Sequence, residues 1–209
     1  MNTQEHWDNV YKTKDHTKVG WYQPLPEISL EILERIGASP EASVIDIGAG
    51  ASSLVDALIR RGFRDIVLLD ISKEAFDIVK ERLEGDKEIP TYLIEDITTA
   101  SLPREYTVWH DRAVFHFLQE EREQQSYLQA MHDALMNTGY AIIGTFAVDG
   151  PESCSSLPVK QYDKETMEAV LKNRFTIVEV IETVHITPGG SEQKFSFFLL
   201  KPVLKVTQH

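Results

Sequence analysis

The sequence contains a single cysteine, Cys154, among its 209 residues. One thiol forms neither an internal disulfide nor a cysteine-based zinc cluster, and the scattered histidines do not suggest a metal site either. No apolar run reaches 18 residues, and the opening residues 1–6 lack the basic and apolar regions of a secretion signal. We therefore expect a cytoplasmic protein that has no membrane partner and binds no metal.

Basic residues are also scarce, with 21 Lys and Arg against 33 Asp and Glu, giving a formal net charge of -12. Nucleic acids and anionic membranes are bound through basic patches that release counterions, so this balance disfavours both as partners. The length is sufficient for one domain with a substantial hydrophobic core. A single domain spanning residues 1–209 is predicted.

A glycine turn near residue 48 lacks the third glycine of a dinucleotide-binding fingerprint. The apolar run 44–47 leads into Gly48 and Gly50, and an amphipathic pattern begins at Leu54. This order predicts a buried strand, a tight turn and a helix whose first N–H groups face a ligand. Ser53 stands where G-x-G-x-x-G has its last glycine, which disfavours an NAD-dependent oxidoreductase.

Three apolar runs contain or end in acidic residues: Asp46, Asp70 and Asp96. Ligands of parallel α/β sheets bind at the carboxyl ends of the strands, so these carboxylates are expected to lie near one another. Asp70 follows Gly48 by 22 residues, close to the spacing of a carboxylate that accepts hydrogen bonds from a ribose. The alternative for Asp70 is capping of the helix that follows it.

Strand and helix patterns alternate five times after residue 42, which predicts a parallel sheet with helices on both faces. The third strand is expected over 91–97 and a polar helix over 121–137. Two β-rich runs, 175–186 and 194–200, then flank a Pro-Gly-Gly turn and predict an antiparallel hairpin. The expected fold is α/β: a Rossmann-like core over 42–203 with a seven-stranded, mostly parallel sheet and a C-terminal antiparallel β-hairpin.

Aromatic residues are concentrated ahead of the first strand. Trp7 and Tyr11 lie in a helical pattern, and Trp21 and Tyr22 follow a charged stretch at 12–18. We interpret residues 1–37 as an N-terminal helical lid segment, with ordinary packing of an aromatic helix face as the alternative.

Asp46-x-Gly48-x-Gly50 resembles motif I of the class I S-adenosylmethionine-dependent methyltransferases, in which Ser52 occupies the place of a frequent third glycine. The W-D-x-x-Y pattern that begins at Trp7, followed by an aromatic pair, is similar to a subfamily that includes trans-aconitate-type and protein-lysine methyltransferases. The stretches 109–118 and 145–151 also resemble bacterial methyltransferases. The resemblance implies S-adenosylmethionine as cofactor and S-adenosylhomocysteine as product.

The resemblance also implies a set of cofactor-binding residues. The aromatic residues would close over the methionine end, Asp46 would orient the amino group indirectly, and Asp70 would hold the ribose hydroxyls. Asp96 and Ile97 would meet the adenine, with Ile71 beside it, and Asp111 would complete the pocket. The full set is Trp7, Tyr11, Trp21, Tyr22, Asp46, Gly48, Gly50, Asp70, Ile71, Asp96, Ile97 and Asp111.

Candidates for the chemical step lie at the end of the fourth strand, expected over 107–111, and just beyond it. His116 and His110 titrate near neutral pH and are candidate bases, although either also fits a core position. Arg112 is a candidate clamp for an anionic acceptor, with a structural ion pair as the alternative. Cys154 has no matched base and is expected to be inert. A small-molecule acceptor is the leading hypothesis; the alternatives are protein-lysine methylation and a non-catalytic cofactor-binding module.

Overall fold

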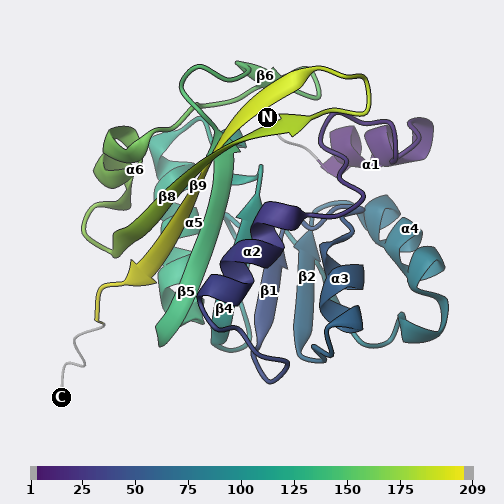
Figure 1. Cartoon of the computed structure of the whole chain (residues 1–209), viewed down its shortest axis with the longest axis horizontal. Helices are drawn as coiled ribbons and strands as arrows, with labels where there is room; N and C mark the ends of the chain where they lie inside the picture. Colours follow the sequence, from purple (N-terminus) through teal and green to yellow (C-terminus); the bar gives the residue numbers. More distant parts are fainter. Residues whose placement is uncertain (1–3, 205–209) are drawn as a thin grey trace.

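The computed structural model describes residues 4–204 and consists of one mixed sheet covered by helices (Figure 1). The helices are α1 (Gln4–Thr13), α2 (Glu27–Arg35), α3 (Leu54–Arg60), α4 (Lys73–Leu83), α5 (Glu121–Ala134) and α6 (Lys164–Leu171), with short 3-10 turns η1 (Glu84–Asp86) and η2 (Phe115–Phe117). The strands are β1 (Val44–Ile47), β2 (Ile66–Asp70), β3 (Thr91–Ile94), β4 (Tyr106–Arg112), β5 (Leu135–Phe146), β6 (Ser153–Cys154), β7 (Leu157–Pro158), β8 (Phe175–Ile186) and β9 (Glu192–Pro202).

The main sheet has seven strands in the order β3-β2-β1-β4-β5-β9-β8. The first five strands of this order pair in parallel, whereas β9 runs antiparallel to both β5 and β8. The β8–β9 hairpin therefore adds one reversed strand to an otherwise parallel sheet. The predicted seven-stranded architecture with its C-terminal antiparallel hairpin is confirmed.

Helices cover both faces of the sheet, and each face has its own hydrophobic cluster. Leu33, Leu58 and Phe76 of α2, α3 and α4 pack on one face, and Met131 and Met167 of α5 and α6 pack on the other. Figure 1 shows α2 and α3 in front of the sheet and α5 behind it. Burying one such side chain contributes about 1.5–3 kcal/mol, so the two clusters hold the strand ends in fixed positions.

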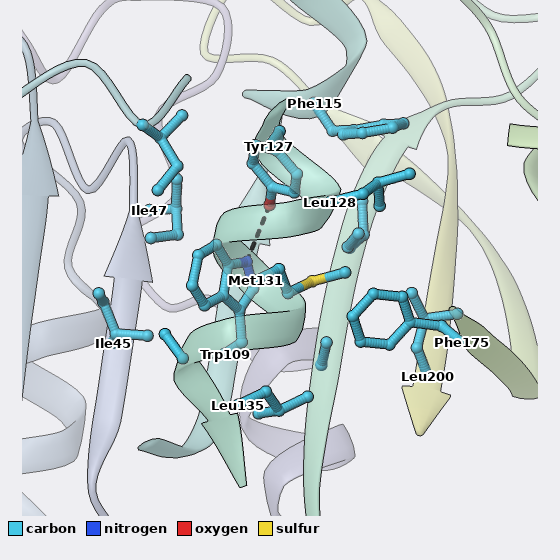
Figure 2. Packing of buried hydrophobic residues seen from close by; sticks show 14 of the residues in the cluster. Ile45, Ile47, Trp109, Phe115, Tyr127, Leu128, Met131, Leu135, Phe175 and Leu200 are labelled. Carbon is cyan, nitrogen blue, oxygen red and sulfur yellow. Dashed lines mark hydrogen bonds between the residues drawn. The ribbon is translucent and has the colours of Figure 1, made fainter. Parts of the chain in front are cut away.

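The core behind β4 contains a polar link that no sequence pattern indicates. Trp109 on β4 donates its indole N–H to the Tyr127 hydroxyl of α5 over 2.8 Å (Figure 2). Both side chains are fully buried, and such groups need a partner because water cannot reach them. This contact fixes α5 against the strand that carries Asp111 and Arg112.

Two predicted boundaries are wrong. The helix predicted over 121–137 ends at Ala134, because Leu135 has extended backbone angles and already pairs with Tyr106 of β4. The third strand ends at Ile94 rather than at residue 97, because Asp96 forms a turn in which its carboxylate accepts the N–H of Thr98. The segment between β5 and α6 contains the short β6–β7 pair.

Candidate active site

A cavity lies at the carboxyl ends of the parallel strands, beneath the N-terminal segment. It combines residues from the ends of β1, β2 and β4, from the turns after β1 and β3, and from residues 7–23. Ten of the twelve predicted cofactor residues line it, namely Trp7, Tyr11, Trp21, Tyr22, Asp46, Gly48, Asp70, Ile71, Asp96 and Ile97. The structure thus brings together side chains separated by up to 90 positions (7 to 97) in one depression of the surface.

Both glycines of the turn have backbone angles that favour glycine. Gly48 has φ +59°, and a Cβ there would lie 1.9 Å from Cγ2 of Val114. Gly50 has φ +52°, and its Cβ would lie 2.3 Å from the Tyr11 hydroxyl oxygen. Gly48 lines the cavity, whereas Gly50 does not. Gly48 therefore permits the close approach of η2, and Gly50 permits the close approach of α1.

Asp70 at the end of β2 holds the turn together from below. Its carboxylate accepts the N–H of Gly50 and the N–H of Ser72, each over 2.8 Å. Burial raises its pKa to about 6, against the opposing effect of these two hydrogen bonds. Each carboxylate oxygen keeps a further acceptor position, so Asp70 can also accept ribose hydroxyls. The residue that caps α4 is Ser72 and not Asp70, because Ser72 Oγ accepts the N–H of Ala75.

Asp46 and His110 form a buried polar network with Ser29 of α2. His110 Nδ1 lies 2.6 Å from Asp46 Oδ1, and Nε2 lies 2.8 Å from Ser29 Oγ. A carboxylate only accepts, so Nδ1–H is donated to Asp46, and in the neutral imidazole Nε2 accepts the serine hydroxyl proton. Asp46 and His110 line the cavity, but both ring nitrogens of His110 already have partners. The network orients Asp46 and leaves His110 without a free nitrogen to act as a base.

Asp111 does not reach the cavity, contrary to the predicted role in completing the pocket. Its carboxylate points into the core, where it accepts the Tyr127 hydroxyl over 2.6 Å and the N–H groups of Val114 and Phe115 over 2.8 and 3.0 Å. The side chain is fully buried, and burial raises its pKa to about 6. Asp111 shapes the β4–η2 connection, which carries Val114 to the glycine turn.

His116 is likewise absent from the cavity wall. It is fully buried against Phe117 and Phe146, its Nδ1 accepts the N–H of Phe146 over 3.4 Å, and its Nε2 has no partner. Burial, aided by the positive charge of Arg112, lowers its pKa to about 3. A base with so low a pKa does not accept a proton at neutral pH, so the geometry does not favour the predicted general-base role.

Arg112, at the end of β4, does line the cavity. Its Nη1 donates to the backbone oxygen of Trp21 over 2.9 Å, and its guanidinium lies 4.9 Å from the ring centre of Phe195. Cys154 lines the cavity too, and burial raises the pKa of its thiol to about 11. The cysteine is therefore protonated at neutral pH, as expected of an unreactive thiol.

The N-terminal segment is fastened over the cavity by hydrogen bonds to distant elements. Ser53 Oγ donates to the Gln23 oxygen over 2.8 Å, and His185 Nε2 donates to the Gly20 oxygen over 2.8 Å. On α1, Asp8 accepts the Ser72 hydroxyl over 2.7 Å. Trp7 packs edge-on against Trp21 and Phe117, with ring centres 5.8 and 5.4 Å apart. Figure 1 shows α1 beyond the ends of β1 and β2.

Several contributors to the site have no motif in the sequence. Arg82 of α4 donates to the backbone oxygens of Ala51 and Ser52 over 2.9 and 2.6 Å and pairs with Asp56 over 2.7 Å. It thereby holds the glycine turn from its outer side. Other cavity residues outside the prediction include His16, Gln23, Glu95, Glu123 and Phe117. Helical spacing places Arg82 on α4, but only the packing of α4 on α3 brings it to the turn.

Comparison with known proteins agrees with this geometry. Residues 44–139 match the family model of the methyltransferase domain. EEF1A lysine methyltransferase 2 of Danio rerio is 25% identical over 205 residues, covering 91% of this chain and 82% of that protein.

Solved structures show the same fold. An S-adenosylmethionine-dependent methyltransferase from Anabaena variabilis has a TM-score of 0.76 at 16% identity, covering 97% of this chain and 96% of the other. The N-methyltransferase NodS from Bradyrhizobium japonicum, in complex with S-adenosylhomocysteine, has a TM-score of 0.73 at 14% identity, covering 98% and 100%.

The matched domain and the shared fold identify an S-adenosylmethionine-dependent methyltransferase. Its sequence is similar, at 25% identity, to that of an eEF1A lysine methyltransferase. The prediction of a methyltransferase over an NAD-dependent oxidoreductase is confirmed. Among residues 4–204, no helix has the length and apolar character needed to cross a membrane, and no three His, Cys, Asp or Glu side chains are grouped to hold a metal ion.

The residues present fit this cofactor. The positive φ at Gly48 lets the backbone approach a ligand, and the carboxylates of Asp70 and Asp96 lie in the same cavity as Ile71 and Ile97. When bound, the cofactor supplies an electrophilic methyl group whose S–C electron pair remains on sulfur as the methyl leaves. The protein positions the acceptor and excludes water, and positioning alone can supply roughly 7–11 kcal/mol at best. No covalent enzyme intermediate is needed.

Proposed function

We propose that this methyltransferase acts on a small-molecule acceptor enclosed beneath residues 7–23. The observation that carries the proposal is that the protein's own N-terminal segment covers part of the cavity. Six residues of this segment line the cavity, namely Trp7, Tyr11, His16, Trp21, Tyr22 and Gln23. Hydrogen bonds at Gly20, Trp21 and Gln23 hold this segment over the cavity. A covered cavity suits a compact acceptor better than the surface of a docked protein.

A second feature supports an acceptor that arrives ready to react. A carboxylate or thiolate transfers no proton during methylation, whereas a hydroxyl requires a base. Among the described residues, two histidines line the cavity, His16 and His110, and both nitrogens of His110 already have partners. A carboxylate or thiolate, which needs no base, therefore suits this cavity, whereas an alcohol would have to rely on His16.

Protein-lysine methylation is the second candidate. It is favoured by the similarity to EEF1A lysine methyltransferase 2, which extends over 91% of this chain. In that case the cover would have to open to admit a lysine side chain. The net charge of -12 is compatible with a basic partner.

A methyl-labelling assay separates the two candidates. The protein is incubated with S-adenosylmethionine carrying a radiolabelled methyl group and either a metabolite panel of acids, thiols and amines or a cell lysate. The lysate is then separated into protein and small-molecule fractions. We expect the label in the small-molecule fraction. Label confined to protein, with methyl-lysine found by mass spectrometry, would replace this proposal by the lysine one.

The cover is expected to become more ordered when the cofactor binds. Residues 12–18 are polar and largely exposed, whereas the aromatic residues on either side line the cavity and gain contacts with a bound ligand. Hydrogen exchange should therefore slow across residues 4–23 on addition of S-adenosylhomocysteine. The exposed turn at residues 84–87 serves as an internal control. Unchanged exchange throughout 4–23 would favour static packing over a lid.

A further inference from the structure

The guanidinium of Arg112 carries a buried charge that forms no ion pair with the described residues. Its Nη1 donates to a backbone oxygen, but Nε and Nη2 are shielded from solvent and have no hydrogen-bond partner. No ion pair among residues 4–204 includes Arg112, in contrast to Arg82, which pairs with Asp56. Burying an unpartnered charge lowers stability, so its retention points to a functional role.

The surroundings of Arg112 offer no negative charge in direct contact. Burial lowers the pKa of the guanidinium to about 10, so it stays positive at neutral pH. Burial raises the pKa of Cys154 to about 11, and burial together with the arginine charge lowers the pKa of both His116 and His185, so these neighbours are neutral. The charge of Asp46 acts on the guanidinium, but this carboxylate forms no ion pair with it and already accepts from His110. The unpartnered N–H groups of Arg112 are suited to bind an anionic ligand.

A second cavity adjoins the cofactor cavity near Arg112. It is lined by Lys14 and Lys18 from the N-terminal segment and by Gln193 of β9, and it shares Trp21 and Cys154 with the cofactor cavity. Lys18 pairs with Asp15 over 3.4 Å, which leaves the region with a net positive charge in a chain whose overall charge is -12. Locally positive walls attract anions even when the whole molecule is acidic.

We propose that the acceptor is an organic acid that enters past Lys14 and Lys18 and is held by its carboxylate on Nε and Nη2 of Arg112. This inference rests on the small-molecule function proposed above. Two parallel N–H donors on one edge of a guanidinium match the two oxygens of a carboxylate.

The same arginine links acceptor binding to closure. Nη1 holds the Trp21 oxygen while Nε and Nη2 lie beneath the cover, so the acid reaches them when residues 14–22 open. Reclosure over the bound acid restores the Trp21 contact and removes water from the reacting groups. Trp21 and Cys154, which both cavities share, mark where the acid passes from one to the other.

Matched pairs of acids and amides test the proposal by calorimetry on the S-adenosylhomocysteine complex. Glutarate and benzoate are compared with glutaramide and benzamide, which have similar shapes but no charge. We expect the acids to bind at least tenfold more tightly than the amides. R112M should remove this preference, whereas R112K, which keeps the charge but loses the paired donors, should retain part of it. R60M, at an exposed position outside both cavities, should leave it unchanged.

A thermal measurement without any acceptor gives an independent readout. If the charge is unpaired in the free protein, R112M removes a cost and raises the Tm by about 2–4 °C, as expected for a chain of this size. A lower Tm, with acid binding retained, would show that Arg112 serves the fold and would overturn the inference. Equal binding of acids and amides, or no acid binding at 10 mM, would overturn it as well.

The methyl-labelling assay keeps the two proposals apart. A labelled metabolite without an acidic group, formed equally well by R112M, would refute the organic-acid inference and leave the small-molecule function intact. Label in protein alone would refute the small-molecule function itself.

Discussion

D70A is expected to weaken the binding of S-adenosylhomocysteine by about 1–3 kcal/mol, roughly a 5- to 150-fold loss of affinity. The variant removes the proposed acceptor for the ribose hydroxyls. It also leaves the N–H groups of Gly50 and Ser72 without the carboxylate that now accepts them over 2.8 Å. Calorimetric titration at pH 7.5 measures the effect. D86N, at an exposed position in η1, is the matched control and should bind normally.

The same carboxylate predicts how cofactor binding depends on pH. Burial raises the pKa of Asp70 to about 6, so the group is ionised above that pH and progressively protonated below it. Ribose hydroxyls donate to the ionised form, so affinity should be full above about pH 7 and fall as the pH drops through 6. Asp111 titrates in the same range but lies outside the cavity. D70N therefore distinguishes them: the decline should disappear in this variant, and its persistence would assign the titration elsewhere.

G48A is expected to abolish cofactor binding and to lower the free energy of unfolding by about 2–5 kcal/mol. About 1–2 kcal/mol arises from placing alanine at φ +59°, and about 1–3 kcal/mol from overpacking, since the new Cβ would lie 1.9 Å from Cγ2 of Val114. The β4–η2 connection has to move away from the turn to accommodate it. Urea unfolding and calorimetric titration measure the two effects.

Two further variants test the cause of this effect. G85A is the matched control, because no atom lies within 4 Å of its Cβ position and no positive φ is involved. The double variant G48A/V114A removes the clashing methyl groups and should recover part of the stability, the remainder reflecting the backbone angle. Full stability and binding in G48A alone would contradict the close approach seen between the turn and η2.

The architecture was predictable because its signals are local. Each signal lies within a short stretch of sequence. These signals are the apolar run that ends in Asp70, the glycines at 48 and 50, and the alternating strand and helix patterns. Parallel strands align their carboxyl ends by geometry alone, so the acidic residues at those ends were expected to share one cavity. The boundaries near Leu135 and Ile94 were mistaken because strand pairing with a distant partner, and a side-chain turn at Asp96, overrode local propensity.

Side-chain direction depended on packing between elements far apart in the sequence. Asp111 and Arg112 are adjacent, yet alternation along β4 sends the carboxylate to Tyr127 in the core and the guanidinium to Trp21 beneath the cover. His116 follows the same strand but is enclosed by Phe117 and Phe146, where burial makes it a poor base. Alternation within β4 separates Asp111 from Arg112, but which of the two faces the cavity depends on the elements that pack on each face of the sheet.

The sequence by itself determined the class of fold, the cofactor and ten of the residues that line the cavity, because strand ends and a glycine turn are specified by neighbouring residues. Only the tertiary structure decided which polar groups are already satisfied. The Asp46–His110–Ser29 network and the carboxylate of Asp111 find their partners within the chain, whereas Nε and Nη2 of Arg112 do not. That difference arises because desolvation and pairing are properties of the three-dimensional surroundings, and a sequence of residue types does not contain them.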